Sequence, residues 1–195
     1  MSAKQARPGG RSARVRSAVV TAAQEVLVDA GPAEFAVGEV ARRAGVHETS
    51  IYRRWGTRER LLLEAMATLS SKLLPIPDTG SLREDLIAFG HALAEYAAGP
   101  PGQTLLRTMA STSDNDQTTG VREEFWRTRY RECRPIVDRA AVRGEIAETV
   151  DARVLLETFV SGVHFRLLLT REEVDQAFLE RLADIAMWAA GSAAP

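Results

Sequence analysis

Residues 37–62 read VGEVARRAGVHETSIYRRWGTRERLL, and this stretch has the spacing of a helix-turn-helix. A small residue, Ala41, lies four positions before Gly45, and the apolar residues Val46 and Ile51 follow the glycine. The glycine allows the turn a positive φ, and the small residue allows two short helices to cross closely. The second helix then keeps its outer face free to enter a major groove. A generic pair of helices joined by a glycine turn shares part of this pattern.

The same stretch resembles the signature of the TetR family of transcriptional regulators, the tetracycline-repressor-like proteins. In that signature an Ala-Gly-Val turn precedes a recognition helix with Thr/Ser-(Leu/Ile)-Tyr, an aromatic residue and then Lys-Glu-x-Leu. The matching segments are 44–46, 51–52, Trp55 and 59–62, and residues 143–151 are similar to the segment between the seventh and eighth helices of these proteins. The resemblance implies an all-α fold, with an N-terminal three-helix DNA-binding domain and a C-terminal helical domain for ligand binding and dimerisation.

The resemblance and the helical pattern together assign roles around the recognition helix. The candidates for contacts with base edges are His47, Glu48, Thr49, Ser50 and Arg53. The residues placed for phosphate contact or for packing are Tyr52, Arg54, Trp55, Thr57 and Arg58. His47 stands where the family usually has Ser or another small cap, and Arg58 stands where it often has a phosphate-contacting Lys. Because imidazole is a poor helix cap, His47 is expected to face the DNA instead.

Charge is distributed unevenly, although the formal net charge is −1. Residues 1–60 contain eleven Lys/Arg and six Asp/Glu, whereas residues 61–195 contain fourteen and twenty. A basic first third on an acidic remainder is typical of a nucleic-acid-binding head, and chance surface composition produces the same asymmetry. The basic tail of residues 1–11 is expected to be flexible, and it either reaches a minor groove or stays solvated. Its basic residues are Lys4, Arg7 and Arg11.

Apolar periodicity and turn residues predict about nine helices and no strand. A helix-turn-helix domain is expected over residues 12–74 and a ligand-binding and dimerisation domain over residues 81–195, with Pro75 and Pro77 at the hinge. The predicted helices cover about 12–30, 37–44, 48–54, a segment bearing Leu62 to Leu73, a segment from Ser81 to about 98, 103–110, 121–143, 151–169 and 170–190.

Local signals predict where the helices of the second domain begin and end. A polar loop is expected over residues 111–120, Pro135 is expected to kink the long helix that follows, and Gly144 is expected to end it. The expected helix caps are Ser81 with Glu84, Asp151, and Thr170 with Glu173.

One short recognition helix reads only a few base pairs. A regulator of this type is therefore expected to be a homodimer that reads two half-sites about 34 Å, or a multiple of that distance, apart. The resemblance places the interface on the last two helices, as a four-helix bundle, and the alternative is that their apolar stripes face their own subunit. The expected interface residues are Leu155, Thr158, Ser161, Gly162, Phe165, Leu169, Phe178, Leu179, Leu182, Ile185, Ala186 and Ala189.

The resemblance also places a ligand pocket inside the second domain. The candidate lining residues are Phe89, Tyr96, Met109, Phe125, Trp126, Tyr130, Phe159 and His164. Pockets are mostly apolar with a few polar groups, and aromatic residues at helical spacing also form plain core. His91 and His164 are lone histidines and are not expected to bind metal. Cys133 is either a redox sensor or a buried inert thiol.

These observations predict a ligand-responsive transcriptional repressor that binds a palindromic operator in double-stranded DNA and is released by a small apolar effector. An activator would use the same head. Two other classes stay open: an all-helical enzyme, and an interaction module whose helix pair binds a partner helix. An enzyme is not expected, because no nucleophile–base pair, glycine-rich phosphate loop or metal-ligand spacing is evident. With no secretory signal and no apolar run of about 18 residues, we expect a cytoplasmic protein without membrane partner, cofactor or metal.

Overall fold

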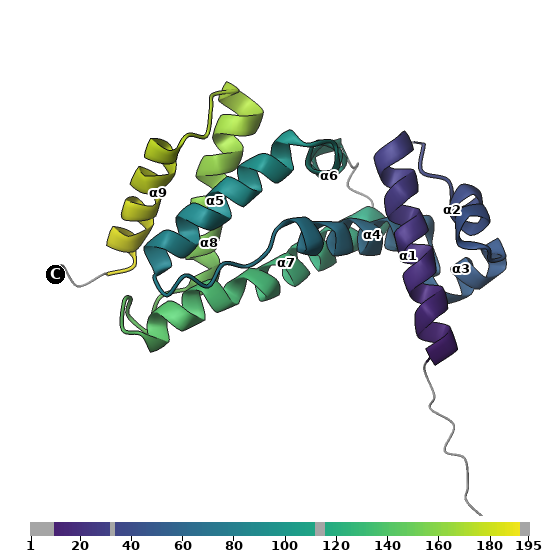
Figure 1. Cartoon of the computed structure of the whole chain (residues 1–195), viewed down its shortest axis with the longest axis horizontal. Helices are drawn as coiled ribbons and strands as arrows, with labels where there is room; N and C mark the ends of the chain where they lie inside the picture. Colours follow the sequence, from purple (N-terminus) through teal and green to yellow (C-terminus); the bar gives the residue numbers. More distant parts are fainter. Residues whose placement is uncertain (1–9, 32–33, 112–115, 192–195) are drawn as a thin grey trace, which may run out of the picture.

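Nine α-helices and one short π-helix make up the described part of the chain (Figure 1). The computed structural model describes the backbone of residues 10–31, 34–111 and 116–191. No strand occurs in these ranges, which confirms the predicted all-α class. The helices are α1 (Gly10–Ala30), α2 (Val37–Ala44), α3 (Glu48–Trp55), α4 (Arg58–Leu73), α5 (Leu82–Ala98), α6 (Pro100–Ser111), α7 (Asp116–Val142), α8 (Ala152–His164), the π-helix η1 (Phe165–Thr170) and α9 (Gln176–Ala189).

The first four helices pack around a small shared core at one end of the molecule (Figure 1). α1 lies against α2 and α4 and buries Val19, Ala23 and Val26. The short helix α3 contributes Ile51 and Trp55 to the same core. A helix of two turns is marginal by itself, so these buried contacts hold α3 in place.

Two glycines set the geometry of the helix-turn-helix. Gly45 has a φ of 65°, and the N–H of Val46 donates to the carbonyl of Ala41 over 3.0 Å, so the turn between α2 and α3 has the left-handed residue that the spacing predicts. Gly56, with a φ of 76°, ends α3. Thr57 then caps α4, because its Oγ1 accepts a backbone N–H of the first turn at 3.2 Å. Only these two residues separate α3 from α4, so the orientation of α3 follows that of α4.

α4 links the two ends of the molecule (Figure 1). Its first half buries Leu61, Leu62 and Ala65, and α4 packs there against α1 and α3. Its second half packs against α6 and α7 and buries Ser70, and Leu74 is buried immediately after it. The same helix therefore belongs to both cores.

α5 lies at the centre of the other end, in contact with α6, α7, α8 and α9. Gly90 allows α9 to come close, because a Cβ at this position would lie 2.5 Å from Cδ2 of Leu179 and 3.1 Å from Cζ of Phe159. Asp151 caps α8 as predicted, with Oδ1 accepting two backbone N–H groups of the first turn at 2.9 and 3.2 Å.

Two predicted boundaries in the middle of the chain are wrong. α7 is already helical at Asp116, so the loop predicted over 111–120 is too long. α6 begins at Pro100 instead of residue 103, because proline has a preset φ and needs no N–H partner in a first turn. Pro135 lies inside α7, as predicted, and the chain is helical on both sides of it.

The predicted start of the last helix is also wrong. The α-helical part of α8 ends at His164, and the chain continues as the π-helix η1. Arg171 then takes a left-handed conformation with a φ of 57°. α9 begins at Gln176, because Oδ1 of Asp175 accepts a first-turn N–H at 2.8 Å. Thr170 lies within η1 and caps nothing.

The predicted capping box at the start of α5 is absent. Ser81 makes no side-chain cap hydrogen bond. Instead, the buried carboxylate of Asp85 accepts from the N–H and the hydroxyl of Thr79 at 2.7 and 2.8 Å, and the first N–H of α5 donates to Glu145 at 2.6 Å. Side chains outside the Ser81–Glu84 spacing, one of them distant in sequence, therefore hold this helix start.

Candidate functional site

The outer face of α3 is polar and exposed. His47, Thr49, Tyr52 and Arg53 are exposed there, and Ser50 is half-buried. His47 is the residue before the helix and makes no side-chain cap hydrogen bond, as expected for a poor cap, and its contact with DNA stays a prediction. This face presents hydrogen-bonding groups of the kind that read base edges.

Four of the predicted DNA-contacting residues also make contacts within the chain. Arg54 Nη1 donates to Ser12 Oγ at 3.0 Å. Arg58 Nε donates to the carbonyl of Phe35 at 2.8 Å, and its guanidinium lies 5.6 Å from the Phe35 ring. Thr57 is the cap of α4. Glu48, although exposed, places Oε1 over Gly38 of α2, 2.9 Å from where a Cβ would be. These residues hold the head together at the edge of the exposed face.

Trp55 is a core residue, one of the two alternatives left by the sequence. It is buried, and its Nε1 donates to Glu64 Oε2 of α4 at 2.8 Å. Arg16 of α1 pairs with the other oxygen of the same carboxylate. Trp55 therefore joins α3 to α4 and, through Glu64, to α1.

The basic tail lies mostly outside the described residues, and so do the side chains of Lys4, Arg7 and Arg11. The backbone is helical from Gly10, so α1 includes the last two residues of the predicted tail.

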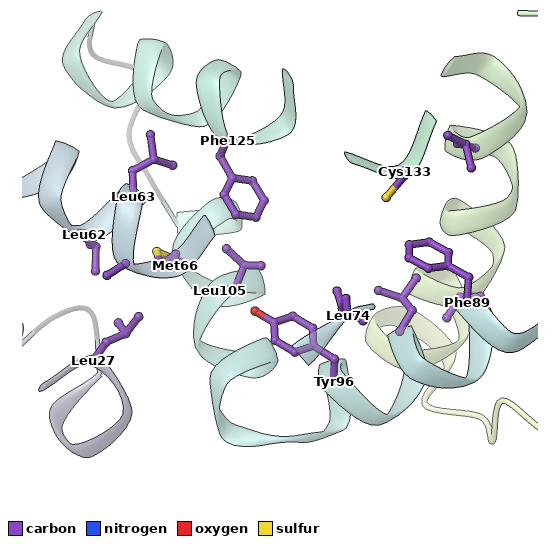
Figure 2. Packing of buried hydrophobic residues seen from close by; sticks show 14 of the residues in the cluster. Leu27, Leu62, Leu63, Met66, Leu74, Phe89, Tyr96, Leu105, Phe125 and Cys133 are labelled. Atoms are coloured by element: carbon purple, nitrogen blue, oxygen red, sulfur yellow. The ribbon is translucent and has the colours of Figure 1, made fainter. Parts of the chain in front are cut away.

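An apolar cavity of about 60 Å³ lies between α4, α5, α6, α7 and α8. Figure 2 shows Leu74, Tyr96 and Leu105 converging in this interior from three different segments. Its lining residues are Ser70, Leu74, Phe89, Leu93, Tyr96, Ala97, Leu105, Leu106, Phe125, Trp126, Arg129, Tyr130, Cys133, Leu156, Val160 and His164. Six of the predicted ligand residues are brought together here: Phe89, Tyr96, Phe125, Trp126, Tyr130 and His164.

The other two predicted ligand residues are not placed in this wall. Phe159 is fully buried and packs behind it, toward Gly90 of α5. The side chain of Met109 lies outside the described residues.

The titratable groups of the cavity wall are shifted toward their neutral forms. Burial lowers the pKa of His164 and raises the pKa of the Cys133 thiol. Burial also raises the pKa of Tyr96, whose hydroxyl accepts from Ser70 Oγ at 2.8 Å, and raises the pKa of Tyr130 to about 12. At neutral pH the fixed charge of the described wall is therefore the guanidinium of Arg129.

Arg129 was missed by the sequence reasoning, since it is one of many arginines along α7. Its side chain is buried, with Nη1 donating to Glu132 Oε2 at 2.7 Å. Its position three residues after Trp126 and four before Cys133 places it on the same helical face as those two residues. That spacing is the signal that could have identified it.

The outer face of α8, η1 and α9 carries a group of exposed apolar side chains. Six of the predicted dimer residues are exposed: Thr158, Ser161, Phe165, Leu169, Ile185 and Ala189. Trp188, 83% exposed, was missed, although it lies three residues after Ile185 in the same stripe.

Three predicted dimer residues are buried inside the subunit instead. Leu155, Leu179 and Ala186 are at most 7% exposed, so their side chains have almost no surface to offer a second copy. The remaining three are half-buried: Gly162 and Leu182 pack on one another, and Phe178 lies under the guanidinium of Arg166 at 3.9 Å from its ring centre. The alternative that the stripe faces its own subunit therefore holds for the buried residues, and for the exposed residues the dimer interface stays a prediction.

Two family profiles match the chain. The profile described as "Bacterial regulatory proteins, tetR family" matches residues 19–65, and the profile described as "Tetracyclin repressor-like, C-terminal domain" matches residues 76–186. The second match alone covers more than half of the chain. The chain belongs to the TetR family.

Relatives and solved structures support this assignment to the TetR family. The HTH-type transcriptional regulator AqdR of Rhodococcus erythropolis is 37% identical over 154 residues, which cover 79% of this chain and 74% of AqdR. The DNA-binding transcriptional repressor TetR of Mycobacteroides abscessus is 31% identical over 175 residues, 86% and 89% of the two chains. The crystal structure of the TetR family transcription regulator SCO0332 superposes with a TM-score of 0.79 at 27% identity, covering 93% and 100%.

The protein is thus a TetR-family transcriptional regulator with a DNA-binding helix-turn-helix, and the names of these relatives are those of regulators and not of enzymes. In the described ranges no group of His, Cys, Asp and Glu side chains is arranged to hold a metal ion. Among the described helices, none is long and apolar enough to cross a membrane.

Proposed function

We propose that this TetR-family protein is a homodimeric repressor that binds a palindromic operator and leaves it when a small, mostly apolar effector fills the cavity. In this proposal residues 12–74 bind DNA, and residues 81–195 bind the effector and the second subunit. The observation that carries it is α4. This helix follows the recognition helix after two residues, and its other end supplies Ser70 and Leu74 to the cavity wall.

The exposed face of α3 supports base reading by His47, Thr49, Ser50 and Arg53. Tyr52, Arg54 and Arg58 lie beside it and are assigned to the phosphate backbone, with Arg54 and Arg58 already oriented by Ser12 and Phe35. Glu48 and Thr57 are assigned to holding α3 in place. Phosphate contacts add salt-dependent affinity, whereas contacts to base edges add sequence discrimination.

The dimer is assigned to the exposed apolar face of α8, η1 and α9, with Phe165, Leu169, Ile185 and Trp188 as its centre. Large exposed apolar side chains grouped on one face are typical of protein interfaces, and aromatic residues contribute most to their affinity. A two-fold pairing there would present two recognition helices to two half-sites.

The test is selection of bound sequences from random double-stranded DNA by the full chain. We expect an enriched inverted repeat, whose binding falls steeply as salt is raised. Arg53→Ala and Thr49→Ala should each relax the preference at particular bases. Enrichment of no inverted repeat would overturn the operator proposal. A small-molecule screen for release of the selected DNA then tests the effector part.

A further inference from the structure

Arg129 is an unusual component of a mostly apolar and otherwise uncharged wall. It lines the cavity from α7 and is only 6% exposed, among aromatic side chains that include Tyr96 and Trp126. A charged group at this depth is costly unless it is paired and hydrogen-bonded. Within the described part of the chain, no Asp or Glu lines the cavity, so the cavity itself has a positive character.

The partners of Arg129 leave part of its hydrogen-bonding capacity open. Its Nη1 donates to Glu132 Oε2 at 2.7 Å, and its Nη2 lies 3.9 Å from Cys133 Sγ, a weak acceptor. Glu132 is itself partly exposed, outside the cavity wall. A guanidinium has further N–H donors in a planar fork, which matches the two oxygens of a carboxylate.

The carboxylate of Glu132 also binds α4. Ser71 Oγ lies 2.8 Å from both oxygens of Glu132, so one carboxylate accepts from α7 on one side and from α4 on the other. The three side chains form a polar chain, Arg129–Glu132–Ser71, from the cavity wall to the helix that follows the recognition helix. We call this chain the Arg129 relay.

We propose that the effector is an amphipathic carboxylic acid: an aromatic or aliphatic body that enters the apolar cavity, and one carboxylate that pairs with Arg129. The body must widen the cavity as it enters, because about 60 Å³ is less than the roughly 150 Å³ of a cavity that binds benzene. This inference rests on the proposed function, because it assigns a chemical class to the effector of the same cavity. A single carboxylate fits better than a phosphate dianion, because one guanidinium offers one compensating charge and the rest of the wall is uncharged.

The relay gives this class of ligand a route to the DNA-binding end. A ligand carboxylate on the open N–H donors shares the charge of the guanidinium with Glu132 and draws the Arg129 side chain toward the cavity. The contact between Arg129 and Glu132 then weakens, and Glu132 depends more on its contact with Ser71 on α4. The ligand thereby changes the packing of α4 against α7. An uncharged molecule of the same shape can change this packing only through its volume.

The ligand class is tested with matched acid and amide probes, added separately to the full-length protein: benzoate with benzamide, 2-naphthoate with 2-naphthamide, and decanoate with decanamide. Binding is followed by fluorescence, since Trp126 lines the cavity, and by thermal shift. For at least one pair we expect the acid to bind about tenfold or more tightly than its amide, as for a charged hydrogen bond. No preference for any acid, including no binding of any probe, overturns the inference.

Arg129→Met should abolish the preference for the acid, whereas Arg129→Lys should keep part of it. The matched control is Arg127→Met, which removes an exposed arginine of the same helix and should leave the preference unchanged. Circular dichroism and the melting temperature show whether each variant is folded. A folded Arg129→Met or Arg129→Gln protein that still prefers the acid contradicts the pairing.

The relay is tested by release of selected operator DNA. Ser71→Ala should bind the acid as wild type does but need several-fold more of it to release DNA, whereas Thr68→Ala, an exposed position on the same helix, should release it normally. Unchanged release by Ser71→Ala overturns the relay. The binding assay needs no DNA, so the two proposals can fail separately. If the protein prefers the acid but DNA selection finds no inverted repeat, the proposed function is contradicted and the ligand class is still supported.

Discussion

The two ends of this molecule form their functional surfaces in different ways. At the DNA-binding end, the position of α3 is set by residues near it in sequence: Gly45 before it, Ile51 within it and Thr57 after it. At the other end, helices meet through residues far apart, such as Gly90 against Leu179. A local motif can therefore be read directly from the sequence, whereas a cavity or an interface exists only after the helices have packed.

The largest loss of stability is expected when a large buried side chain is truncated in either of the two cores. Phe159→Ala should lower the free energy of unfolding by about 3–5 kcal/mol and Ile51→Ala by about 2–5 kcal/mol, because both side chains are fully buried. Urea denaturation measures both. Val142→Ala, which removes part of an exposed side chain, is the control and should stay within about 0.5 kcal/mol. If the two ends are cooperative, both core variants shift one common transition; separate transitions would divide the molecule into independent units.

Trp188→Ala should weaken the proposed dimer by about 2 kcal/mol or more, roughly 30-fold in dissociation constant, because it removes the most exposed aromatic side chain of the face. Sedimentation equilibrium measures the monomer–dimer balance. Val142→Ala serves again as an exposed apolar control, because Val142 lies on α7 and not on the helices of this face. An unchanged balance for Trp188→Ala would place the interface elsewhere.

Arg53→Ala should cost about 1–3 kcal/mol of binding to the selected operator, with the preference lost at one base position of each half-site. Fluorescence anisotropy with operator variants measures this. Arg127→Ala removes the same charge from an exposed site on α7 and should bind as wild type does. Equal weakening on every DNA sequence would show that Arg53 contacts phosphate instead of a base.

Two equivalent caps compare the ends directly. Thr57→Ala and Asp151→Ala should each destabilise the protein by about 1 kcal/mol, seen as lower melting temperatures, because each removes a side-chain acceptor from a helix start. Thr57→Ala should in addition weaken operator binding, since it lies beside α3. Ser81→Ala is the matched control, because Ser81 precedes a helix without capping it. A loss for Ser81→Ala equal to the other two would contradict the assignment of the caps.

The smallest effect concerns Cys133, the one cysteine of the chain, which lies in the cavity wall and so reports on that end of the molecule alone. Burial raises the pKa of its thiol, so less thiolate forms at a given pH in the folded than in the unfolded protein. We expect Cys133 to react slowly with a thiol reagent at pH 8 in the folded protein and faster in urea. We also expect the free energy of unfolding to fall slightly as the pH rises past the ordinary thiol pKa. Rapid labelling of the folded protein would favour the redox-sensor alternative; Cys133→Ser should lose the pH effect.

The sequence predicted the features that depend on short-range geometry. Gly45 in the left-handed turn and the cap at Asp151 both follow from residue type and spacing, and both are present. Thr170 with Glu173 has a similar local pattern, but the left-handed Arg171 intervenes and Asp175 supplies the cap. Here two local patterns compete, and only the packed chain selects between them.

Burial was harder to predict than helix position. Leu179 and Ile185 both belong to the predicted interface on α9, yet the first is buried under α5 and the second is 58% exposed. Arg129 and Arg127 differ by two positions on α7, and only the first is turned into the cavity wall. Helical periodicity gives the relative direction of such side chains but not which direction faces the neighbouring helices.

The length of α4 sets how small a movement is enough to control DNA binding. Its 16 residues span about 24 Å at about 1.5 Å per residue. A tilt of about 5° at the cavity end therefore displaces the other end by roughly 2 Å, more than the spread of distances over which a hydrogen bond to a base survives. In a two-fold dimer the displacements of the two subunits add, so the distance between the two recognition helices departs further from the spacing of the half-sites. A small displacement of α4 at the cavity is therefore enough to disturb hydrogen bonds between α3 and DNA bases.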